Sequence, residues 1–312
     1  MTELCQVTKE NATITIGKQL VEMKKPLQKS SIPDNKVFVI RDMREPYFDR
    51  HWHAHPEYQL FAILKGSGTR YIGDDIRSFR GGELVLTGPG LPHVWRSDNE
   101  YFDLSNGLDT HGIVIYFGDS FLGKNAWEKE EFADVAKLLD KSCLGLEITG
   151  KTNKKVIGMM KELVRLKGTR SIIMLMEILA TLAESTEINT ISQVNYSYKQ
   201  PEPEKDKMGE ILEYILKNYK NKISLKEVAS LANMSESAFS RYFKSHVNKS
   251  FSDFLGDVRI SNARKLLQEG DLNISQVCFE SGFPTLSNFN KQFKDRLGKT
   301  PLAYKKDYID TF

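Results

Sequence analysis

The chain has 312 residues, of which 40% are hydrophobic and 27% charged, and its formal net charge is +3. This balance is typical of a globular protein of about two domains and argues against a disordered or fibrous chain. The three cysteines, Cys5, Cys143 and Cys278, are too far apart for a disulfide framework, which favours a reducing compartment. Because the sequence has neither an apolar run of about 18 residues nor a secretion signal, we expect a cytoplasmic protein with no membrane partner.

Short β-rich runs dominate residues 37–117. Gly, Pro, Asp and Asn separate them at intervals of roughly ten residues, which predicts a β-barrel or sandwich. The expected strands have the sequences VFVI, EYQLFAIL, TRYIG, GELVLTG and GIVIYFG. We assign residues 1–127 to this first domain.

The apolar spacing then changes to that of helices, as at Val135 and Leu138 and again over residues 172–183. We interpret residues 128–184 as a helical linker block, whose apolar surface either packs on the β-domain or forms a dimer interface. The polar segment 185–206 contains two prolines and is expected to be an extended interdomain linker.

Residues 207–312 form a basic region with an internal repeat. It has 17 Lys and Arg against 12 Asp and Glu, a net charge of +5, which favours a polyanionic partner. Phe239 and Phe243 correspond to Phe289 and Phe293 at an offset of 50 residues. Each copy has the pattern of two short helices joined by a turn, so one helix-turn-helix unit is used twice.

The turn and the two faces of the second helix are also recognisable in each copy. Asn233 and Gly282 stand at the turns and tolerate a left-handed backbone, and Ser235 is placed to cap the following helix. The faces opposite the phenylalanines carry residue types that hydrogen-bond base edges and phosphates. These residues are Ser237, Ser240, Arg241 and Lys244 in the first copy, and Ser287, Asn290, Lys291 and Lys294 in the second.

This region resembles the DNA-binding domain of AraC/XylS-type transcription regulators, through LKEVASLANMSESAFSRYFK and through GFPTLSNFNKQFKDRLGKTPLAY. The resemblance implies two helix-turn-helix units bridged by a helix over about residues 251–268. A bridge of that length spans about 26 Å, so the two recognition helices would enter successive major grooves. The resemblance also adds Leu286 to the DNA-binding set. Many members have a polar residue at this position, and the alternative to a base hydrogen bond for Leu286 is contact with a thymine methyl group.

Five of the six histidines lie between positions 51 and 111. In the run HWHAH, alternation on a strand would place His51, His53 and His55 on one face, and Gln59 has the same parity. Clustered neutral imidazoles are typical of a metal site.

The stretch from His51 to about Asp98 resembles the cupin sensor half of the same regulators. Cupins carry a motif HxHxxxE followed by Gly, and His53, His55 and Gly66 fit it, whereas Gln59 stands at the Glu position. The second motif runs from Gly82 to His93, with Gly88 in place of Pro and Ser97 in place of Asn. The fold class expected for the whole chain is therefore α+β and multidomain: a cupin-like β-barrel, a helical block and an all-α double helix-turn-helix domain.

Three interpretations of the histidines stay open: direct contacts with an effector, a divalent metal at His53, His55 and His93, or a purely structural role. We favour effector contacts and assign no metal and no cofactor, because Gln is a weaker ligand than Glu. The candidate effector-binding residues are His53, His55, Gln59, His93, Trp52, Tyr58, Trp95 and Arg96.

The sequence thus predicts a transcription activator that responds to a small molecule, such as a sugar, and binds double-stranded promoter DNA through residues 207–312. A homodimer and a contact with RNA polymerase are expected. The alternatives are a metal-dependent cupin enzyme fused to a DNA-binding module, which the missing carboxylate argues against, and a constitutive activator whose barrel only dimerises. We expect no enzymatic activity.

Overall fold

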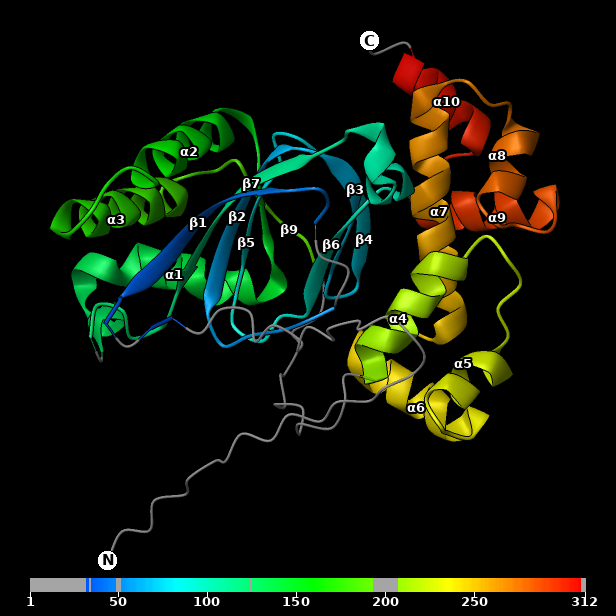
Figure 1. Ribbon diagram of the computed structural model, residues 1–312, viewed down its shortest axis with the longest axis horizontal. Helices are drawn as coiled ribbons and strands as arrows, with labels where there is room; N and C mark the ends of the chain where they lie inside the picture. The colour runs from blue at the N-terminus through cyan, green and yellow to red at the C-terminus, as the bar shows by residue number, and fades with distance from the viewer. Residues whose placement is uncertain (1–31, 34, 49–51, 124, 193–206, 310–312) are drawn as a thin grey trace, which may run out of the picture. The chain divides into compact units, whose positions relative to one another are not determined.

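The computed structural model of the chain describes residues 32–33, 35–48, 52–123, 125–192 and 207–309 (Figure 1). The first 31 residues of the predicted β-domain, His51, and residues 193–206 of the predicted linker lie outside these ranges. Over the described residues, none of the helices has the length and apolar character that crossing a membrane requires.

The N-terminal part is built from two antiparallel sheets. The larger sheet has the strand order β1 (Phe38–Glu45), β7 (Thr110–Phe117), β2 (Tyr58–Lys65), β5 (Leu84–Thr87), β8 (Leu146–Ile148) and β9 (Ile188–Thr190). The smaller sheet has the order β4 (Asp75–Arg80), β3 (Ser67–Ile72) and β6 (His93–Ser97). Five of these strands coincide with the apolar runs of the sequence.

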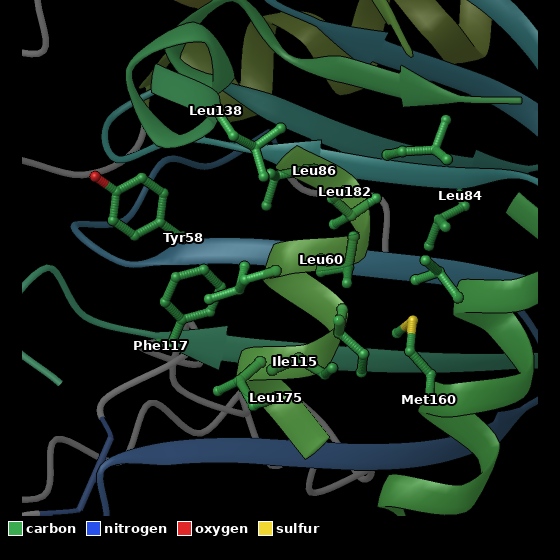
Figure 2. Packing of buried hydrophobic residues seen from close by; sticks show 14 of the residues in the cluster. Tyr58, Leu60, Leu84, Leu86, Ile115, Phe117, Leu138, Met160, Leu175 and Leu182 are labelled. Carbon is green, nitrogen blue, oxygen red and sulfur yellow. The ribbon is translucent and has the colours of Figure 1, made fainter. Parts of the chain in front are cut away.

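The central strand β2 is buried on both faces of the larger sheet. Leu60 and Ala62 belong to one hydrophobic cluster, and Phe61 and Ile63 to another, because successive side chains of a strand point to opposite faces. The first cluster packs the sheet against three helices (Figure 2). These are α1 (Ala133–Lys141), α2 (Gly150–Leu163) and α3 (Thr169–Ala183).

The helices confirm the helical spacing in residues 128–184, but that region is not only helical. Residues 146–148 form β8, which pairs with β5, and β9 in turn pairs with β8. Strand β9 lies within the segment that the sequence assigns to the linker, so at least residues 188–190 belong to the sheet. Short 3₁₀ helices complete this part at Asn99–Phe102, Leu104–Asn106, Ala126–Glu128, Glu130–Phe132 and Ser142–Leu144.

The C-terminal part is all helical, and the two parts together confirm the predicted α+β class. Its helix α7 follows the bridge expected from the sequence closely. The helices are α4 (Lys207–Asn218), α5 (Leu225–Leu231), α6 (Glu236–Val247), α7 (Phe251–Glu269), α8 (Ile274–Glu280), α9 (Leu286–Leu297) and α10 (Pro301–Ile309).

The two helix-turn-helix units, α5–α6 and α8–α9, repeat the same local chemistry. Capping boxes begin both first helices, with Ser224 paired to Glu227 and Asn273 to Gln276. The turns have left-handed backbones, with φ of 54° at Asn233 and 84° at Gly282. A Cβ on Gly282 would lie 2.5 Å from the carbonyl oxygen of Tyr219, so this turn requires glycine.

Each second helix is anchored by its pair of phenylalanines. Phe239 and Phe243 are fully buried and contact the ring of Phe251 at the start of α7. In the second unit, Phe289 contacts Phe283, and Phe293 contacts Tyr304 in α10. Burial of one such side chain stabilises the fold by about 1.5–3 kcal/mol, so these pairs fix which face of α6 and of α9 remains exposed.

Candidate functional site

The exposed faces of α6 and α9 carry all nine residues that the sequence assigns to DNA contacts. Even the apolar Leu286 is 39% exposed at the first position of α9. The side chains form two strips, one on each second helix, and each strip carries two cationic residues. The residues are Ser237, Ser240, Arg241, Lys244, Leu286, Ser287, Asn290, Lys291 and Lys294.

The serines differ from the long cationic side chains in how many hydrogen-bond donors they leave exposed. Ser240 Oγ donates to the carbonyl oxygen of Glu236 at 2.8 Å, so its hydroxyl proton is already used within α6. Ser237 Oγ lies 3.3 Å from Ser235 Oγ, which caps the helix. Arg241 therefore provides the long, multiply donating group on this face, as bidentate recognition of guanine requires.

An ion-pair network on α7 positions the recognition helices, and sequence analysis missed it. Asp257 accepts hydrogen bonds from Arg296 Nε in α9 at 2.5 Å and from Lys249 Nζ at the end of the first unit at 2.7 Å. One carboxylate thus joins the bridge helix to both units. The signal in the sequence was weak, because Asp257 lies outside the repeated motif.

In the N-terminal part, three histidines gather at one place. The ring centroids of His53 and His93 lie 4.6 Å apart and those of His55 and His93 5.0 Å apart. One ring nitrogen from each of the three lies within 4.8 Å of the others. The strand expected through the HWHAH run is reduced to an isolated bridge between His53 and His93, so this backbone bridge brings the rings together rather than strand alternation alone.

Hydrogen bonds orient two of the rings towards Gln59. His55 Nδ1 donates to the carbonyl oxygen of Glu57 at 3.0 Å, and His93 Nδ1 donates to that of Leu91 at 2.8 Å. The Nε2 atoms of both rings lie 3.3 Å from Gln59 Oε1. His55, Gln59 and His93 are all buried, so these groups form an enclosed polar centre.

Aromatic rings enclose this centre on two sides. The rings of Trp95 and His93 pack edge to face with their centroids 5.6 Å apart, so Trp95 lies at the centre where the sequence analysis placed it. Tyr116 meets His55 at 5.4 Å and pairs with Gln59 across β7 and β2. Sequence analysis missed Tyr116, although its place in GIVIYFG is the signal that would have found it. Burial raises the pKa of Tyr116 to about 12, so its hydroxyl stays neutral.

Three of the predicted effector residues do not join the cluster. Tyr58 points to the opposite face of β2, where it stacks on Phe117 in the core beneath the helices (Figure 2). Arg96 follows Trp95 on β6 and points the other way, over the ring of Phe102. Trp52 is buried in a different hydrophobic cluster from Trp95. These three side chains lie away from the histidines because neighbours in an extended chain face opposite sides, and their contact with an effector stays a prediction.

A second buried polar group lies on the far side of Trp95. Arg70 is fully buried and is surrounded by the carboxylates of Asp75, Glu83 and Glu147 at 3.1–3.5 Å. Trp95 Nε1 donates to Glu83 Oε1 at 3.2 Å. Burial raises the pKa of Glu83 to about 7, although Arg70 and Trp95 lower it. The pKa of Asp75 is raised by burial as well.

Comparison with known proteins agrees with this division of the chain. A family model described as an AraC-like ligand binding domain matches residues 35–109, and one described as a helix-turn-helix domain matches residues 228–307. YdeC of Bacillus subtilis, a transcriptional regulator of the helix-turn-helix type, is 24% identical over 261 residues, which cover 83% of this chain and 87% of YdeC. The regulatory protein PocR of Salmonella typhimurium is 31% identical over 115 residues, which cover 37% of this chain and 38% of PocR.

Among solved structures, ToxT of Vibrio cholerae is 14% identical with a TM-score of 0.34, over 86% of this chain and 97% of ToxT. The exposed recognition helices and the enclosed polar centre define a DNA-binding transcription regulator with a ligand-binding domain. The chain belongs to the AraC family of these regulators. Its relatives are regulators rather than enzymes, which confirms the expectation that it is not an enzyme.

Proposed function

We propose that this regulator activates transcription when a small polar molecule binds at the centre formed by His53, His55, Gln59 and His93. The observation that supports this site best is the convergence of buried imidazole and amide groups between the rings of Trp95 and Tyr116. Aromatic faces combined with a few fixed hydrogen-bonding groups are typical of sites for small polar ligands such as sugars.

On DNA, the two helix-turn-helix units would together recognise one continuous binding site. Helix α7 has 19 residues and is therefore about 28 Å long, close to one turn of DNA, so α6 and α9 would enter successive major grooves. Arg241 and Asn290 would read bases, whereas Lys244, Lys291 and Lys294 would neutralise phosphates. Leu286 would contact a thymine methyl group.

We further propose that the protein works in the cytoplasm as a homodimer and contacts RNA polymerase at the promoter. Dimerisation would join two double units on neighbouring half-sites. The second half-site would then bind at a raised effective concentration, which increases affinity without any new contact.

The experiment is a thermal-shift screen of the full chain against sugars and small organic acids, followed by promoter binding and a reporter assay with any hit. Binding to the native state raises the unfolding midpoint. We expect a hit to change both promoter affinity and reporter output, and His55→Ala to abolish the shift. The control is His111→Ala, whose ring pairs with Asp42 instead. A hit that stabilises His55→Ala as strongly as the unchanged protein would place the effector elsewhere.

A further inference from the structure

The two helix-turn-helix units pack on different halves of helix α7. The first half of the helix contributes Leu255 and Val258 to the hydrophobic cluster that holds α6. The second half contributes Ile260 and Ala263 to a separate cluster that holds α8 and α9. Apolar contacts therefore fix each unit on its own half of α7, whereas the distance and rotation between the units depend on contacts that cross from one half to the other.

Asp257 makes such a contact at the boundary between the two halves. Its Oδ1 accepts a hydrogen bond from Arg296 Nε in α9 at 2.5 Å, and its Oδ2 accepts one from Lys249 Nζ at 2.7 Å. Arg296 Nη2 also donates to the carbonyl oxygen of Asp253 at 3.3 Å, so one guanidinium group spans a full turn of α7. The Asp257 side chain is only 18% exposed, which makes this link stronger than an ion pair at the open surface.

Gly256 allows α9 to approach α7 this closely. A Cβ at residue 256 would overlap Arg296 Nη2 and would lie 2.8 Å from Gln292 Oε1. A larger side chain there would displace the guanidinium group from the helix. The absence of a side chain at residue 256 and the carboxylate at the next residue thus act together on Arg296.

Arg259 forms a second link between the units on the opposite side of α7. It lies two residues after Asp257, which turns its side chain by about 200° around the helix axis. Arg259 donates to the carbonyl oxygens of Tyr219 and Asn221, both at 2.8 Å. Its guanidinium group also lies over the ring of Phe283, in the turn of the second unit. Two links on opposite sides of one helix fix the rotation of the second unit as well as its distance from the first.

We propose that Asp257 determines which spacing of the DNA site the protein accepts, because it holds α9 at one distance and rotation relative to α6. One base pair added between the two parts of a site turns the second part by about 35° and shifts it by about 3.4 Å. A rigid pair of helices tolerates neither change, whereas a pair that turns about the remaining Arg259 link can follow the DNA. The inference rests on the proposed recognition of one site by both units and adds the residue that rejects sites of the wrong spacing.

The test uses the full-length protein and the duplex that it selects most strongly from random DNA, with derivatives that have one or two base pairs inserted or removed between the two parts. We expect a change of one base pair to weaken binding of the unchanged protein by about 10–100-fold, comparable to the cost of a mismatched base pair. Asp257→Ala should reduce this penalty to less than about threefold, and should weaken binding to the best duplex by about three- to tenfold, because preorganisation is lost. The control Asp295→Ala removes the same charge from an exposed position of α9 and should keep the full penalty.

The ratio of affinities for the best and the altered duplexes separates this role from a merely structural one. Partial unfolding of a variant lowers its apparent affinity for every duplex by the same factor and leaves the ratio unchanged. Arg296→Ala breaks the same link from the other helix, so it should reduce the penalty as Asp257→Ala does, and the double variant should reduce it no further.

Two results would overturn the proposal while both units still bind DNA. One is that the unchanged protein binds every spacing equally well, and the other is that Asp257→Ala keeps the full penalty. Selection of a motif with a single part by the unchanged protein would instead contradict the joint recognition on which the proposal rests.

Discussion

Glu83→Gln tests the buried ionic group around Arg70. The Glu83 side chain is only 11% exposed, and burial raises its pKa from 4.5 to about 7 despite the pairing with Arg70. Gln has the shape of the protonated carboxyl group and cannot ionise. The variant therefore removes the pH dependence that Glu83 gives to the stability of the N-terminal part, while Trp95 keeps a hydrogen-bond acceptor.

The sign follows from proton binding. Between pH 4.5 and 7 the folded state holds the Glu83 proton more tightly than the unfolded state, so the free energy of unfolding falls as pH rises and levels off above pH 7. A pKa difference of about 2.5 corresponds to about 3 kcal/mol in total, of which about 2–3 kcal/mol is lost between pH 5 and 8. Glu83→Gln should gain stability over the unchanged protein by that amount across the same interval.

The assay is urea unfolding followed by tryptophan fluorescence at several pH values from 5 to 8. All three tryptophans, Trp52, Trp95 and Trp127, precede residue 128, and Trp95 donates a hydrogen bond to Glu83 itself, so the signal includes a direct report on this buried group. Glu130→Gln, at an exposed position, is the control. If the stability difference between Glu83→Gln and the unchanged protein is the same at pH 5 and pH 8, the reasoning about this buried carboxyl group is refuted.

Three further substitutions test other parts of the account. Arg241→Ala should cost about 1–3 kcal/mol of specific DNA binding without loss of far-UV circular dichroism, and equal affinity for the operator would contradict a base contact. Ser224→Ala removes the first capping box and should lower the stability of the helical part by about 1 kcal/mol, measured by thermal circular dichroism against Ser240→Ala. Gly68→Ala should prevent folding of the β-domain, because its Cβ would meet the carbonyl oxygen of Arg96 at 2.0 Å; a normal tryptophan spectrum and yield would contradict this close approach.

Local sequence patterns predicted the DNA-binding half well. Its structure follows from short-range features: the spacing of Phe239 and Phe243, the cap at Ser235 and the left-handed turns at Asn233 and Gly282. Each of these features depends on residues only a few positions apart, so the local sequence predicts it directly. The link through Asp257 was missed because it joins elements about 40 residues apart.

The β-domain was less predictable because its contacts are long-range. Strand β8 pairs with β5 across about 60 residues, and nothing in the local composition of residues 146–148 indicates that partner. Within the site, His53, His55, Gln59 and His93 do come together, but Tyr58 and Arg96 were included for their nearness in sequence. Strict use of strand parity would have excluded Tyr58 and favoured Tyr116.

In vitro selection of binding sites from random double-stranded DNA by the full-length protein tests the central claim most directly. The account predicts an enriched motif with two parts about one helical turn apart, roughly 10 base pairs, one for α6 and one for α9. Repeating the selection with Arg241→Ala should relax the sequence preference of one part and leave the other intact. A motif with a single part, or no enrichment at all, would contradict the account in which two recognition helices bind one DNA site together.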